Sequence, residues 1–137
     1  MSTSIRAEVS KKNKYYISKH RYYELKHYCM QYQSWKDSLD MINHYPKQAL
    51  SKVIFQSDNA DPVFRLAEAR SFYEDRLKSL EDIANKIDPI IGPCVLEGVT
   101  SGLSYEVLRT RIDIPCCKDV YYEIYRKFFW VLDKIRN

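Results

Sequence analysis

The longest run of helical apolar spacing lies between Pro62 and Ile87, and it contains no Gly and no further Pro. Apolar side chains recur there at intervals of three and four residues, which is typical of a helix with one buried face. Asp61 can cap this helix, and a proline at the first helical position loses no backbone hydrogen bond. The pattern therefore predicts one long helix from Pro62 to about Ile87.

Composition extends the helical prediction to the rest of the chain. The 137 residues are 45% hydrophobic and include only 3 Gly and 5 Pro, which is too few for the many tight turns of a sandwich or barrel. A chain of this length buries one core more readily than two. We predict an all-α protein, organised as a helical domain with a long central helix.

Capping residues and changes of pattern divide the chain into four segments. We expect a mobile basic arm at 1–13, a basic aromatic helical segment at 14–43, a linker at 44–61 and a helical domain at 62–137. Ser18 can cap a helix that runs to about Gln31, and the spacing of its apolar residues predicts that Tyr22, Leu25 and Cys29 are buried. A second short helix follows, marked by Trp35, Leu39 and Ile42.

Two further helix ends are visible before the last third of the chain. Asp88 and Pro89 repeat the arrangement of a cap followed by proline, and they predict a helix from Ile90 to about Thr100. Gly102 follows it and is suited to end a helix in a left-handed conformation.

Residues 103–135 have the pattern of a helix-turn-helix. Ser104 can cap the first helix, and Ile112 to Pro115 form the predicted turn, in which Pro115 cannot continue the helix and Ile114 fills the angle between the two helices. In the first helix the predicted buried side chains are Val107, Leu108 and Ile112.

The second helix of this pair is expected from Cys117 to about Lys134. Its predicted buried stripe consists of Val120, Ile124, Phe128, Val131 and Ile135, which leaves the opposite face to charged residues and Tyr122. Helix-turn-helix proteins reach DNA bases from the first turns of such a helix. The candidate base contacts are Lys118, Asp119, Tyr122 and Arg126, although the same residues also suit an ordinary solvated face.

The net charge of +4 is unevenly distributed along the chain. Residues 1–36 carry a balance of +6, residues 37–103 a balance of −4 and residues 104–137 a balance of +2. Two basic ends are suited to a polyanion. The candidate phosphate contacts are Arg109, Arg111 and Lys127 near the predicted turn and second helix, and Lys19, Arg21 and Lys26 in the N-terminal segment.

The long helix also carries apolar residues at heptad spacing, which could form the seam of a homodimer or pack on the chain's own helices. The candidate seam residues are Leu66, Tyr73, Leu77, Leu80 and Ile87. A dimer would present two copies of a DNA-binding helix.

Other classes of function leave little trace in the sequence. No run of apolar residues is long enough for a membrane span, and the four scattered cysteines are expected to be reduced thiols of a cytoplasmic protein. The three histidines have no suitably placed nucleophile, and no phosphate loop or dinucleotide motif is present. We therefore expect no enzyme, no cofactor, no catalytic residue and no metal site.

Three sequence segments carry a resemblance to a known family. They are YYISKHRYYELKHYCMQYQSWK at 15–36, GLSY at 102–105 and IPC at 114–116, so both ends of the chain take part. The chain resembles a family of small phage-encoded proteins of Firmicutes, whose C-terminal part is similar to region 4 of sigma factors and to late transcriptional regulators of the ArpU and RinA type. The resemblance implies a phage or prophage protein in the cytoplasm of a bacterial host, which binds double-stranded DNA and regulates phage genes.

The last helix departs from that family's pattern, because Tyr121, Tyr122 and Tyr125 stand in a region where the family carries an arginine run. A helix with tyrosines in place of arginines is also suited to a protein partner. The alternative is therefore a phage-encoded inhibitor that binds a host factor, either RNA polymerase or a defence nuclease, in the manner of an anti-CRISPR protein.

Overall fold

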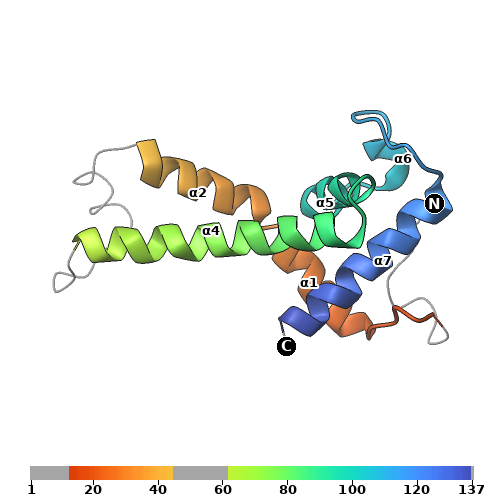
Figure 1. Cartoon of the computed structure of the whole chain (residues 1–137), viewed down its shortest axis with the longest axis horizontal. Coiled ribbons are helices and arrows are strands. Elements are labelled where there is room, and N and C mark those ends of the chain that lie inside the picture. The colour runs from red at the N-terminus through yellow and green to blue at the C-terminus, as the bar shows by residue number, and fades with distance from the viewer. Residues whose placement is uncertain (1–12, 45–61, 137) are drawn as a thin grey trace. The chain divides into compact units, whose positions relative to one another are not determined.

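The computed structural model describes residues 13–44 and 62–136. Within these ranges the chain consists of α-helices and their connections, without a β-strand, so the all-α prediction is confirmed. The helices are α1 (Lys19–Cys29), α2 (Tyr32–His44), α4 (Pro62–Ile87), α5 (Gly92–Ser101), α6 (Tyr105–Leu108) and α7 (Lys118–Ile135) (Figure 1). Apart from Asn13 and His44, the predicted arm and the predicted linker lie outside the described residues.

Helix ends follow the predicted capping residues closely. The Ser18 hydroxyl accepts a hydrogen bond from the Arg21 backbone N–H at 3.3 Å, and α1 begins at the next residue. The Asp88 carboxylate accepts hydrogen bonds from the N–H groups of Ile90 and Ile91, at 2.9 and 2.7 Å, so α5 begins slightly later than predicted. Gly102 has a φ of 77° and closes α5 in the left-handed conformation, which glycine adopts without steric cost.

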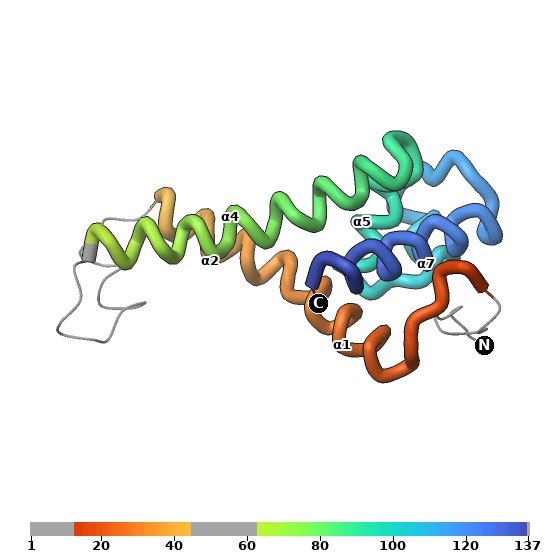
Figure 2. The backbone as a smooth tube through the Cα atoms, turned by 60° about the horizontal axis from the view of Figure 1, so that its bottom comes forward, coloured from red at the N-terminus to blue at the C-terminus, as the bar shows by residue number. Residues whose placement is uncertain are grey.

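The chain divides into two compact units. The larger unit contains the described residues up to Gln31 and those from Leu80 onward, and thus α1, the last two turns of α4, and α5, α6 and α7. The smaller unit, residues 32–79, contains α2 and the preceding part of α4. In the larger unit α1, α5 and α7 pack against one another (Figures 1 and 2).

The core of the larger unit is unusually aromatic. The Tyr22 ring meets the Phe129 ring edge-on at 5.2 Å, and the Tyr22 and Tyr125 hydroxyls share a hydrogen bond of 2.7 Å. Each such ring buries a large apolar area. These contacts join α1 to α7 and confirm the predicted burial of Tyr22, Leu25 and Cys29.

In the smaller unit α2 runs alongside α4 (Figure 1). Ile42 of α2 and Leu66 of α4 are buried against each other, and Met41, Ala69 and Tyr73 pack around them. Leu66 and Tyr73 are two of the five candidate seam residues. Because α2 of the same chain covers them, they do not form the exposed seam that a homodimer would need.

The remaining seam candidates lie further along α4. Leu77 and Leu80 are buried, and Ile87 is half-buried. The predicted apolar stripe of α4 is therefore confirmed from Leu66 onward, whereas its first predicted residue, Val63, is 56% exposed. Of the two interpretations left open for the stripe, packing within the chain accounts for Leu66 and Tyr73.

The predicted buried stripe of α7 is wrong in part. Val120 and Ile135 are exposed, Ile124 and Val131 are half-buried, and of the predicted set only Phe128 is fully buried. The buried face of the helix consists of Tyr121, Tyr122, Tyr125, Phe128, Phe129 and Leu132. Both stripes have helical spacing, but the second buries large rings, which remove more apolar area from water than the aliphatic side chains do.

The connection before α7 is longer than the predicted turn. The first helix of the proposed pair, α6, ends at Leu108, and residues 109–117 join it to α7. Two backbone hydrogen bonds, from Arg111 and Ile112 to the Leu108 carbonyl, continue the coil for one further turn. Leu108 and Ile114 are buried as predicted, whereas Val107 is 43% exposed and does not belong to the core.

Candidate nucleic-acid interface

Two tyrosines hold the connection between α6 and α7 in place. The Tyr122 hydroxyl accepts a hydrogen bond from the backbone N–H of Tyr105 at 3.0 Å. The Tyr105 hydroxyl donates to the Cys116 carbonyl at 2.7 Å. Together these bonds tie the start of α6 to α7 and the end of the connection back to α6.

Tyr122 was predicted on the exposed face of α7, and this placement is wrong. Its side chain is 2% exposed and belongs to the aromatic core, where its ring lies 5.3 Å from that of Tyr125. Hydroxyl-bearing rings are ambiguous in a sequence pattern, because they occur both in cores and on surfaces. Tyr122 is therefore a structural residue and is no longer a candidate for a base contact.

Lys118 lies at the start of α7 and is exposed as predicted, but it is not free. Its ammonium forms an ion pair with the Glu106 carboxylate of α6 at 2.6 Å. The hydrogen bond from Lys118 lowers the pKa of Glu106, and that same bond raises the pKa of Lys118. Asp119 is exposed beside it, so the first turn of α7 presents little positive charge.

Arg126 and Lys127 are the next cations along α7, and both are half-buried. The Nε of Arg126 is buried without a hydrogen-bond partner among the described residues. A buried donor left unpaired costs free energy, and an acceptor outside the protein does not reach this atom while it is buried. Arg109 and Arg111 are exposed on the connection that precedes α7.

Arg21 of α1 was a candidate phosphate contact, but its donors are used inside the protein. Its guanidinium donates to the Asp133 carboxylate at 2.6 Å, to Glu24 at 3.4 Å and to the carbonyl of Arg136 at 3.0 Å. The Asp133 hydrogen bond is the main cause that raises the pKa of Arg21. Arg21 thus joins α1 to the end of α7, whereas Lys19 is exposed and Lys26 is half-buried.

The structure adds a row of rings and cations that the sequence interpretation missed. Trp130 of α7 meets Tyr15 edge-on at 5.5 Å, Lys134 lies over the Trp130 ring at 4.2 Å, and Lys14 lies over the Tyr15 ring at 5.1 Å. The sequence could have indicated this row through Arg126, Trp130 and Lys134, which stand four residues apart and therefore share one helix face. Tyr15 and Lys14, from the start of the described chain, complete this row through tertiary contact.

Comparison of the chain with protein-family models, curated proteins and solved structures gives no match. None of the helices in ranges 13–44 and 62–136 is long and apolar enough to cross a membrane. Within the same ranges, no three His, Cys, Asp or Glu side chains gather as a metal site would require.

Proposed function

We propose that this protein binds double-stranded DNA through the outward face of α7 and the connection before it. The observation that carries the proposal is the side chain of Arg126, which lies half-buried on α7 and forms no ion pair within the part of the chain that the structure describes. A phosphate oxygen or a guanine edge supplies acceptors that fit a guanidinium.

The contact set differs from the one expected from sequence alone. Arg126 is the main candidate for a base contact, with Asp119 as a second, since a carboxylate can accept a hydrogen bond from the cytosine amino group. Arg109, Arg111 and Lys127 are candidates for phosphate contacts, and the Trp130 row extends the basic surface towards the end of α7. Lys118 contributes less because Glu106 already neutralises it.

The biological role that agrees with the sequence resemblance is regulation of phage genes by a protein related in type to sigma region 4. The order of a capped helix α6, a connection and a longer helix α7 supports this role. A transcriptional regulator must discriminate between sequences, and phosphate contacts alone do not provide discrimination.

Duplex binding is tested by fluorescence anisotropy at several salt concentrations, first with DNA that co-purifies with the tagged protein. We expect affinity to fall steeply with salt, and Arg126→Ala to weaken binding by roughly tenfold or more. Lys118→Ala is the matched control, since it also removes a cation from α7, but one that Glu106 already neutralises. It should lower duplex affinity less than Lys127→Ala does. Absence of binding to any duplex at low salt would refute the proposal.

A second function is favoured by a different observation, the apolar exposure next to the proposed interface. Val107 of α6 and Val120 of α7 are 43% and 45% exposed, and Asp119 and Glu123 beside Val120 are acidic. Exposed apolar side chains among acidic ones suit a protein partner better than a polyanion. The corresponding proposal is an inhibitor that binds host RNA polymerase or a defence nuclease.

A variant separates the two functions. Val120→Asp should leave the fold intact, because Val120 is exposed, and should abolish capture of purified polymerase or nuclease if this surface binds protein. If the surface binds DNA instead, the same variant weakens duplex binding through added negative charge. Retention of both activities in Val120→Asp would exclude this part of α7 from either interface.

A further inference from the structure

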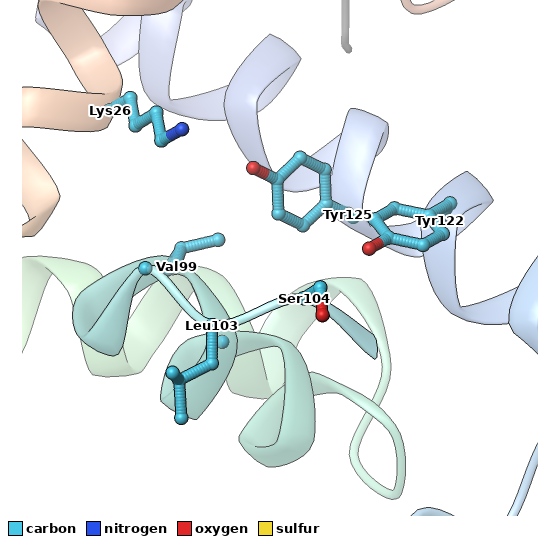
Figure 3. A pocket seen from close by; sticks show the side chains of 8 residues that line it. Lys26, Val99, Leu103, Ser104, Tyr122 and Tyr125 are labelled. Carbon is cyan, nitrogen blue, oxygen red and sulfur yellow. The ribbon is translucent and has the colours of Figure 1, made fainter. Parts of the chain in front are cut away.

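A small pocket opens between α1, the turn that joins α5 to α6, and α7, all within the larger unit (Figure 3). Its volume is about 120 Å³. Sites for cofactors and drug-sized ligands usually measure about 300–1,000 Å³, so this pocket suits a group of only a few atoms. Val99 and Leu103 form apolar walls, and Lys26, Ser104, Tyr122 and Tyr125 supply polar atoms.

Two hydroxyl groups that line the pocket have no acceptor for their proton among the described residues. A hydroxyl carries one proton and two acceptor positions. The Tyr122 oxygen accepts from the Tyr105 N–H at 3.0 Å, and the Ser104 oxygen accepts from the Val107 N–H at 3.3 Å. Each hydroxyl therefore retains its proton for donation, and neither has an acceptor for it among the described residues.

Lys26 adds a positive charge to the same space. In Figure 3 its ammonium points across the pocket towards the Tyr125 hydroxyl. The only interaction recorded for it within the described ranges is a distant one, 5.9 Å from the centre of the Tyr23 ring. Among the described residues that line the pocket none is acidic, so the ammonium has no counter-charge there.

We propose that this pocket binds a small oxyanion of the phosphate type, either as a free ion or as a phosphate group of a larger molecule such as DNA. The Lys26 ammonium would neutralise its charge, and the Tyr122 and Ser104 hydroxyls would donate to its oxygens. An anion supplies the acceptors that these three donors lack, whereas a cation would be repelled by Lys26 and an apolar group would leave the donors unpaired.

The pocket is separate from the proposed DNA-contacting residues of α7. Its residues come from α1, from the end of α5 and the turn after it, and from the buried side of α7, whereas Arg126 and Lys127 do not line it. The inference therefore stands whether or not the protein binds duplex DNA, and it can be tested without any DNA present.

The test is a titration of the full chain with inorganic phosphate, followed by thermal unfolding and by heteronuclear NMR, against sodium chloride at matched ionic strength. We expect phosphate to raise the unfolding temperature and to shift the amide signals of residues around Ser104 and Tyr122. Lys26→Gln should weaken phosphate binding about tenfold or more, and Lys26→Arg should retain it.

Lys86→Gln is the matched control, because Lys86 is an exposed cation of the larger unit, on α4, that does not line the pocket. It should bind phosphate as the unchanged protein does. Equal effects of phosphate and chloride, or equal phosphate binding by Lys26→Gln and the unchanged protein, would overturn the proposal.

A short DNA duplex distinguishes the two sources of the oxyanion once phosphate binding is established. If a backbone phosphate enters the pocket, the duplex displaces inorganic phosphate from it, and Lys26→Gln lowers duplex affinity. If the ligand is a free anion, inorganic phosphate remains bound when duplex is added, and Lys26→Gln leaves duplex affinity unchanged. Either result supports an oxyanion pocket and assigns its source.

Discussion

Gly92 determines how closely α5 can approach the end of α4. A Cβ atom at this position would overlap the backbone carbonyl oxygen of Ala84. Backbone cannot move aside as the end of a flexible side chain can, so the two helices would have to separate. The absence of one methyl group thus sets the packing distance of a whole helix.

Gly92→Ala should destabilise the protein by about 1–3 kcal/mol through overpacking. Chemical unfolding followed by circular dichroism measures this difference. Ala67→Gly, at an exposed position of α4, is a control for the effect of backbone flexibility, and it should lower the free energy of unfolding by roughly 1 kcal/mol. A Gly92→Ala protein as stable as the unchanged one would show that α5 can shift without loss.

The four cysteines differ in their surroundings more than their sequence positions suggest. Cys29 is buried on α1, and burial raises the pKa of its thiol. Burial also raises the pKa of Cys94 and of Cys116, whereas Cys117 is exposed at the start of α7. Because the thiolate is the reactive form, burial and a raised pKa both slow a cysteine's reactions.

Iodoacetamide should therefore modify Cys117 first and Cys29 only after unfolding. Peptide mass spectrometry over a time course measures both rates. In urea the four thiols should react at similar rates, which provides the control. Modification of Cys29 as fast as Cys117 in the folded protein would contradict the buried position of the Cys29 side chain.

At the scale of elements, α4 takes part in two different cores. Its residues before Leu80 belong to the smaller unit and pack on α2, whereas the remainder belongs to the larger unit. The regular apolar spacing along α4 indicated burial along its length, but it could not indicate which neighbour covers each turn. A second copy of α4 and the chain's own α2 would both require the same apolar stripe.

Leu66→Ala tests the packing of α2 on α4. Removal of this buried side chain should destabilise the smaller unit by about 2–5 kcal/mol. Phe64→Ala is the matched control from the same helix, because Phe64 is 60% exposed and its loss should change stability by less than about 0.5 kcal/mol. Hydrogen exchange of the α2 amides measures the effect, and equal exchange in both variants would argue against this contact.

At the scale of the whole molecule, buried tyrosines link stability to alkaline pH. Burial is the main cause that raises the pKa of Tyr121 and of Tyr125 above the ordinary value of 10.0. A raised pKa means that the folded state holds the proton more tightly than the unfolded state does. These groups therefore contribute their full stability below pH 10.0 and lose it as the pH rises further.

We expect unfolding free energy to decline above about pH 10, by up to roughly 1.4 kcal/mol per pH unit for each buried tyrosine. Urea unfolding between neutral pH and about pH 11 measures the decline. Tyr125→Phe should be less stable at neutral pH, since Tyr22 loses the 2.7 Å hydrogen bond, but its stability should fall less steeply in alkali. An unchanged slope in this variant would show that Tyr125 is not the group that titrates.

Much of the helical structure could be predicted from local signals. Ser18, Ser104 and Gly102 cap or end helices where expected, and α4 spans the predicted Pro62 to Ile87. The candidate site was harder to predict, because the residue type of Lys118, Arg21 or Tyr122 does not show whether its polar group is already bonded within the protein. Their partners Glu106, Asp133 and Tyr105 are 12 or more residues away in the sequence, and only folding brings them into contact.

The sequence by itself determined that this protein is helical, where most of its helices begin and end, and that α4 has an apolar stripe. These properties depend on residues within a few positions of one another, through hydrogen bonding, capping and helical periodicity. The tertiary structure decided which face of α7 is buried, which cations are already paired, and that Lys26 meets Ser104 and Tyr122 around one pocket. Those outcomes depend on which distant side chains fill the same space, and no local pattern encodes that choice.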